Sequence, residues 1–161
     1  MKKNITVEEA YSRLSAKCAR AEHCAYDLQK DMKQWEMPDK QQAEIIKRLT
    51  NDNFLNEERY AHAFVKDKFR YNKWGAARLR QELRMRNINE NIIEDALTEI
   101  SEDEIIESLR KLIKQKKETI KAKSDYELKG KLIRFAMSRG FSYSTISKVI
   151  DTDNIQNDED Y

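Results

Sequence analysis

The sequence predicts an all-α protein in which three tandem three-helix repeats stack into an elongated, curved array. Three observations predict this fold. With 3 Gly and 1 Pro in 161 residues, the chain has few of the residues that form β-hairpin turns and glycine-rich loops. Apolar residues recur at helical spacing along nearly the whole chain. In addition, one pattern of apolar positions occurs three times, which is typical of a repeat protein.

The repeat is defined by three apolar anchors at a constant spacing. The three copies of the anchors are Leu28, Met32 and Met37; Leu79, Leu83 and Ile88; and Leu132, Ala136 and Phe141. At the same distance after the last anchor, each copy has one further apolar residue: Ile46, Leu97 and Ile150. A unit of about 50 residues buries little core alone, so we expect neighbouring repeats to stack.

The first repeat covers residues 1–54, with helices expected near 7–19, 22–35 and 39–51. Thr6 and Glu9 have the spacing of a capping box, in which a hydroxyl and a carboxylate satisfy free N–H groups at a helix start. Glu36 stands where the second helix has to end, and Pro38 then prevents its continuation.

The second repeat covers residues 55–100, with helices expected near 57–71, 75–86 and 90–99. Asn56 and Asn89 precede two of these helices and are suited to cap them, because their side chains accept hydrogen bonds from backbone N–H groups. Asn87 follows the middle helix and tolerates the left-handed conformation that ends many helices.

The third repeat covers residues 101–151, with helices expected near 102–121, 125–138 and 143–151. Ser101 and Ser124 each precede a carboxylate at the spacing of a capping box, and Ser142 is a further N-cap. Gly140 is suited to end the middle helix. Residues 152–161 are acidic and contain one aliphatic side chain, Ile155, so we expect a disordered tail there.

No motif in the sequence indicates catalysis. The chain lacks a phosphate-binding glycine loop, a nucleophile elbow and clustered metal ligands. Cys18 and Cys24 have neither a redox nor a zinc spacing, and we expect ordinary reduced thiols. We therefore expect no enzyme activity, no cofactor, and no catalytic or metal-binding residue. Since no apolar stretch approaches the ~20 residues of a membrane helix, we expect a cytoplasmic protein with no membrane partner.

The formal net charge of +2 hides two basic blocks, because 31 Lys and Arg are offset by 29 Asp and Glu. The blocks run from Lys66 to Arg86 and from Arg110 to Arg134. The cations expected to contact a partner are Arg70, Lys73, Arg78, Arg80, Arg84 and Arg86 in the first block, and Lys111, Lys114, Lys117, Lys121 and Arg134 in the second. Helical spacing places Lys114, Lys117 and Lys121 near one face. Stacked repeats could join the blocks into one basic stripe suited to phosphates or to an acidic protein groove. The alternative is that these are only solvated helix faces.

Trp74 stands among these cations at a helix junction. It is either a core residue or an exposed aromatic surface on which nucleic-acid bases stack. Tyr60 and Phe64 are expected in the core, because aromatic residues at helical spacing in a small array usually lie there. We expect Arg59 and Glu82 to join neighbouring helices rather than to form a catalytic pair.

Two segments of the second repeat resemble the signature motifs of the RecX family, whose members regulate the RecA recombinase. Segment 54–64 is similar to the first motif through Leu55, Arg59, Tyr60 and Phe64. Segment 74–88 resembles the second motif through Gly75, Leu79, Leu83 and Ile88. The two segments have the order and distance of the motifs in that family, and the three-repeat arrangement covers residues from about 7 to 151.

The resemblance implies a regulator of RecA in DNA repair, homologous recombination and the SOS response. Such a protein would bind free RecA and the RecA filament on single-stranded DNA, and would restrain recombinase, ATPase and coprotease activities. The basic stripe would then face the filament or its DNA, and the protein would be a monomer that binds DNA weakly and without specificity. Two other functions fit the sequence: a general helical DNA-binding module, and a helical-repeat scaffold that binds only proteins.

Overall fold

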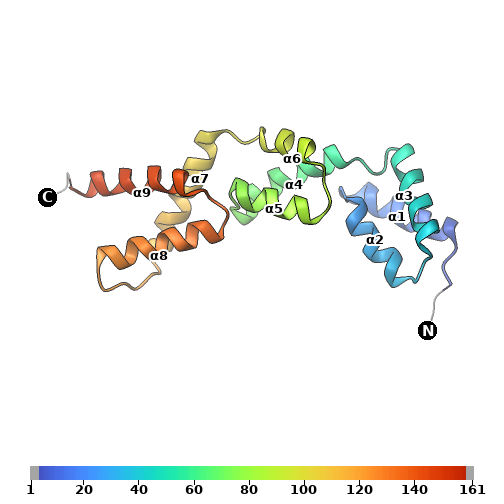
Figure 1. The fold of residues 1–161 in the computed structure, drawn as a ribbon, viewed down its shortest axis with the longest axis horizontal. Helices are drawn as coiled ribbons and strands as arrows, with labels where there is room; N and C mark the ends of the chain where they lie inside the picture. The colour runs from blue at the N-terminus through green and yellow to red at the C-terminus, as the bar shows by residue number, and fades with distance from the viewer. Residues whose placement is uncertain (1–3, 159–161) are drawn as a thin grey trace. The chain divides into compact units, whose positions relative to one another are not determined.

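The structure, a computed structural model, describes residues 4–158, and every regular element in this range is an α-helix. The helices are α1 (Val7–Arg20), α2 (Ala25–Gln34), α3 (Asp39–Asn51), α4 (Glu57–Asn72), α5 (Ala76–Met85), α6 (Glu90–Leu97), α7 (Glu102–Lys117), α8 (Asp125–Ser138) and α9 (Tyr143–Asp158) (Figure 1). The expected all-α fold class is therefore confirmed. The first of two compact units holds the described residues up to Phe64 together with 83–96, and the second holds 65–82 together with those from Leu97 onward.

The middle helix of each repeat ends in the same way. The second residue after each of these helices has a left-handed backbone, with φ of 56° at Glu36, 59° at Asn87 and 92° at Gly140. The next N–H then donates back to the last helical turn, from Met37 to Met32 (3.1 Å), from Ile88 to Leu83 (3.1 Å) and from Phe141 to Ala136 (3.2 Å). This is the Schellman helix end, which brings the last two apolar anchors of each repeat together.

Hydroxyl and amide side chains begin six helices as the sequence predicts. Backbone N–H groups in the first turns donate to the side-chain oxygens of Thr6, Asn56, Asn89, Ser101, Ser124 and Ser142 at 2.8 to 3.2 Å. The reciprocal half of a capping box forms at Ser101, whose N–H faces the Glu104 carboxylate. At α8, the Glu127 carboxylate instead accepts from the N–H of Lys123 at 3.1 Å.

One helix is shorter than expected. α7 ends at Lys117, whereas we expected a helix to residue 121. The chain turns at Thr119, whose N–H and hydroxyl both donate to the Lys116 carbonyl, at 3.0 and 2.9 Å. Ile120 then packs against the apolar core of the second unit. Lys121 therefore lies beyond the helix, and the expectation that it shares a helix face with Lys114 and Lys117 is wrong.

The last helix is longer than expected. α9 extends to Asp158, past the expected end at 151, and it takes in residues 152–158 that we assigned to the tail. The segment contains no Gly or Pro that would interrupt a helix. The remaining tail residues, 159–161, lie outside the described residues.

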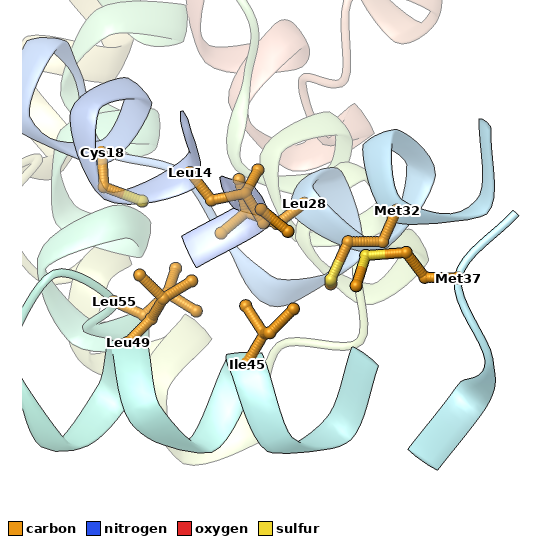
Figure 2. Packing of buried hydrophobic residues seen from close by; sticks show 9 residues of the cluster. Leu14, Cys18, Leu28, Met32, Met37, Ile45, Leu49 and Leu55 are labelled. Carbon is orange, nitrogen blue, oxygen red and sulfur yellow. The ribbon is translucent and has the colours of Figure 1, made fainter. Parts of the chain in front are cut away.

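The helices of the first repeat enclose the apolar core of the first unit. Leu14 of α1, Leu28 and Met32 of α2, and Ile45 and Leu49 of α3 are at most 1% exposed and belong to one cluster (Figure 2). The anchors of the first repeat thus lie in the core, as the repeat pattern predicts. Burial of an apolar side chain of this size contributes roughly 1.5–3 kcal/mol.

Arg59 of α4 joins three segments of the first unit. Its Nε donates to Glu22 at 2.9 Å, and its Nη atoms donate to the side chain and the carbonyl of Asn53 at 3.1 and 3.0 Å. These bonds connect α4 to the α1–α2 connection and to the residues after α3. The other residues of the first motif are 3% to 8% exposed: Leu55, Tyr60 and Phe64.

A second apolar core lies between α7, α8 and α9. Its residues are at most 6% exposed and are Leu109, Ile113, Leu132, Ala136, Phe141, Ile146, Val149 and Ile150. The anchors of the third repeat are among them.

Over the described residues, no helix is both long and apolar enough to span a membrane.

Candidate interaction surface

Within the second unit, the connection between α4 and α5 packs against the connection between α8 and α9. Gly75 N–H donates to the Arg139 carbonyl at 2.7 Å. Ala77 N–H donates to the Gly140 carbonyl at 3.0 Å. A Cβ atom on Gly75 would lie 2.4 Å from the Gly140 oxygen, and one on Gly140 would lie 2.2 Å from the Cβ of Arg78. Neither glycine position can therefore hold a side chain. We call this contact between the α4–α5 and α8–α9 connections the glycine clasp.

The glycine clasp attaches the second motif to the third repeat. Two constraints require glycine at position 140. A side chain there would clash with Arg78, and the backbone φ of 92° lies in the region that favours glycine. From the sequence we placed Gly75 in a motif and Gly140 at a helix end. No sequence pattern indicated directly that the two residues touch. The available signal was the rarity of glycine: the chain has 3 Gly, and two of them form the clasp.

Trp74 lies next to the clasp and is half-buried. The Arg78 guanidinium lies 4.6 Å from the centre of its ring, and Lys68 Nζ lies 5.6 Å from it. Arg78 also donates to the Glu82 carboxylate at 3.2 Å and to the Ser138 carbonyl at 3.4 Å. The aromatic ring and the arginine are therefore packed together with the clasp, so Arg78 is part of the structure of this unit.

The first basic block is divided between the two units. Arg84 and Arg86 belong to the first unit, and the second unit contains Arg70, Lys73, Arg78 and Arg80. Arg84 donates to both carboxylate oxygens of Glu90, at 2.5 and 3.1 Å, and this hydrogen bonding raises its pKa. The Arg86 guanidinium lies 5.0 Å from the centre of the Phe64 ring. These two arginines are thus engaged inside their own unit.

The second basic block is more accessible than the first. We call Lys114 and Lys117 of α7, together with Lys121 in the connection that follows, the lysine row; all three side chains are exposed, as are Lys111 and Arg134. Among the described residues, no acidic side chain forms an ion pair with any member of the lysine row. The ion pair of this part of α7 joins Arg110 to Glu107 at 3.2 Å. The lysine row therefore has fewer contacts to give up when a partner binds than Arg78, Arg84 and Arg86 of the first block.

Buried titratable groups in the first unit have a structural role. Burial raises the pKa of the Cys24 thiol to about 11 and also raises the pKa of Tyr60. A thiol that stays protonated is a poor nucleophile and a poor metal ligand. Both Cys18 and Cys24 are buried and free. Across the described range, no three His, Cys, Asp or Glu side chains are grouped as metal ligands.

Comparison with known proteins points to one family. The family model "RecX, second three-helix domain" matches residues 56–97, and "RecX, third three-helix domain" matches residues 102–150. Together the two matches cover more than half of the chain. They establish tandem three-helix domains and support the expected helical repeat array.

Curated relatives carry the same family name. The "Regulatory protein RecX" of Bacillus subtilis (strain 168) is 34% identical over 122 residues, which is 73% of this chain and 45% of the relative. That of Clostridium perfringens (strain 13 / Type A) is 26% identical over 154 residues, which is 92% of this chain and 72% of the relative. The chain spans about half the length of several other relatives, such as that of Clostridium botulinum (strain Eklund 17B / Type B), where it covers 48%.

Two solved structures have the same fold. "Crystal structure of regulatory protein RecX" aligns with a TM-score of 0.82 and 24% identity, over 90% of this chain and 71% of the other. The RecX structure from Lactobacillus salivarius aligns with a TM-score of 0.79 and 19% identity, over 92% of this chain and 97% of the other. The likeness supports the arrangement of helices.

Proposed function

The chain belongs to the RecX family, and from this premise we propose that it regulates the RecA recombinase. It binds RecA, both free and as the filament on single-stranded DNA, and restrains ATP hydrolysis, strand exchange and coprotease activity. Its place is in DNA repair, homologous recombination and the SOS response, in the cytoplasm. The support for this role is the regulatory name that the relatives carry and the accessible cations of the second unit.

The observation that carries the proposal is the lysine row. Three exposed ammonium groups without described acidic partners can bind carboxylates of a filament or phosphates of its DNA, since no internal ion pair has to break first. Arg78 and Arg84 are less suited to this role, because each already holds a carboxylate at 2.5 to 3.2 Å. We therefore place the main contact of the basic stripe in the third repeat.

A sequence-reading DNA-binding module is the less favoured function. In a helix-turn-helix reader, the first residues of the third helix reach base edges in the major groove. Here α6, the third helix of the second repeat, begins with Glu90, whose carboxylate binds Arg84. A carboxylate at that position repels the phosphates of a duplex, so the second repeat is unsuited to this docking.

Cosedimentation with preformed RecA filaments tests the proposal. We expect the protein to pellet with filaments on single-stranded DNA at physiological salt. On naked DNA we expect weak binding whose affinity falls steeply as the salt concentration rises, because the release of counterions from the phosphates drives it. Tight, sequence-selective binding to naked DNA together with no binding to filaments would favour the DNA-binding module instead. Binding to neither would favour a scaffold for other proteins.

A further inference from the structure

A groove of about 740 Å³ runs between α4 and α7 inside the second unit. On the α4 side it is lined by three cations, Lys66, Arg70 and Lys73. Lys66 and Arg70, four residues apart, share one face of α4, and Lys73 follows the end of that helix. Phe69 and Ile100 supply the apolar part of the lining, and both are half-buried. We call this site the α4–α7 groove.

The start of α7 gives the other side of the groove the opposite charge. Asp103, Glu104 and Glu107 line it there, followed by Ser108 and then by the cation Lys111. The contacts that these carboxylates make run along α7: Glu104 binds Ser101 in the capping box, and Glu107 binds Arg110 at 3.2 Å. The two charged sides therefore face one groove while their described contacts stay on their own helices.

Lys66 and Asp103 show this separation most clearly. Both side chains are exposed, and neither forms an ion pair with a described residue. These opposite charges line the same groove and do not neutralise each other. A ligand with an acidic and a basic side would satisfy both rows at once and cover the apolar lining between them.

We propose that the α4–α7 groove binds an amphipathic helix of the protein partner. The acidic flank of that helix lies along Lys66 and Arg70, its basic flank lies along Asp103 and Glu107, and its apolar side covers Phe69 and Ile100. Helices commonly dock into grooves in this way, through apolar residues spaced at one helical turn. The inference rests on the proposed function in one respect, that the partner is RecA.

A nucleic-acid strand is a poor occupant of the same groove. Its phosphates would lie close to Asp103 and Glu107, well inside the screening length of about 8 Å at physiological salt. The repulsion from these carboxylates offsets the attraction of the α4 cations. The groove and the lysine row therefore have different ligands: a helix with mixed charges binds in the groove, and a uniformly acidic surface binds the row.

A bulky side chain in the groove tests the inference. Ser108→Trp fills the groove from the α7 side without removing any charge, and Gln115→Trp adds the same side chain at an exposed position of α7 outside the groove. We expect the dissociation constant for RecA, measured by fluorescence anisotropy of labelled protein, to rise at least tenfold for Ser108→Trp. We expect it to stay within twofold for Gln115→Trp.

A charge variant provides a second reading if Ser108→Trp folds poorly. Asp103→Lys with Glu107→Lys reverses the acidic side of the groove. The matched control is Asp39→Lys with Glu44→Lys on α3, which makes the same charge change at exposed positions, one of them also in a first helical turn. We expect at least tenfold weaker RecA binding for the groove variant relative to this control, with both variants showing the helical circular dichroism of the wild type.

The outcomes separate this inference from the proposed function. If the wild type binds RecA and the folded groove variants bind equally well, the groove has no part in partner binding and the inference is wrong. If the wild type does not bind RecA at all, the proposed function itself fails. If Ser108→Trp instead converts a dimer to a monomer in sedimentation velocity, the occupant is a second copy of this chain, which would also overturn the inference.

Discussion

Replacing Gly75 by alanine is expected to lower the free energy of unfolding by about 3–4 kcal/mol. The added Cβ would lie 2.4 Å from the Gly140 oxygen and 2.7 Å from the Phe141 nitrogen, and backbone atoms cannot move aside as a flexible side chain can. Relief of the clash has to separate the two connections, which lengthens the hydrogen bonds of Gly75 and Ala77. Urea unfolding followed by circular dichroism measures the change.

The third glycine of the chain is the matched control. A Cβ on Gly130, inside α8, would meet only the end of the Arg134 side chain, at 3.7 Å. Alanine is the better helix former, so Gly130→Ala is expected to raise the free energy of unfolding by roughly 0.5–1 kcal/mol. The two glycine substitutions thus have opposite signs. A loss below 1 kcal/mol for Gly75→Ala would show that the glycine clasp does not hold the second unit together.

Reversing the lysine row is expected to weaken regulation of RecA about 30-fold. In the variant Lys114→Glu with Lys117→Glu and Lys121→Glu, each change replaces an attraction of roughly 0.2–1 kcal/mol by a repulsion of similar size. A total near 2 kcal/mol corresponds to about 30-fold in affinity. The measurement is the protein concentration that gives half-maximal inhibition of RecA ATP hydrolysis on single-stranded DNA.

The control for this variant changes the same number of charges elsewhere. Lys33, Lys40 and Lys47 are exposed in the first unit, and their reversal to Glu gives an identical net charge. We expect this control to inhibit within threefold of the wild type, because its three lysines lie outside the surfaces that we propose as contacts with RecA. Equal weakening of both variants would mean that overall charge, rather than the lysine row, determines binding.

Much of the fold could be predicted from the sequence, because its determinants are local. The buried anchors, such as Leu28 and Met32, were recognisable from spacing alone. Capping residues were recognisable because a side-chain oxygen bonds to an N–H a few positions away. Glu36 shows the limit of residue preferences, since it adopts a φ of 56° where Gly or Asn is usual. The Schellman hydrogen bond and the burial of Met37 stabilise that end despite the side chain.

The surface could be predicted only in part, because it depends on contacts between distant residues. Arg78 and Lys114 look alike in the sequence as members of basic blocks. The structure separates them: Arg78 packs on Trp74 and binds Glu82, while Lys114 is exposed. The same reason hides the α4–α7 groove, whose two sides come from different repeats. Charge counts along the chain cannot show which side chains neutralise one another and which are left for a partner.

The most direct measurement of the central claim is the rate of ATP hydrolysis by RecA on single-stranded DNA while this protein is added. We expect the rate to fall as the protein saturates the filament, at concentrations where cosedimentation shows binding. Bovine serum albumin at the same concentrations controls for non-specific effects and should leave the rate unchanged. A rate that stays constant or rises while the filament carries bound protein would contradict the proposal that this chain restrains RecA.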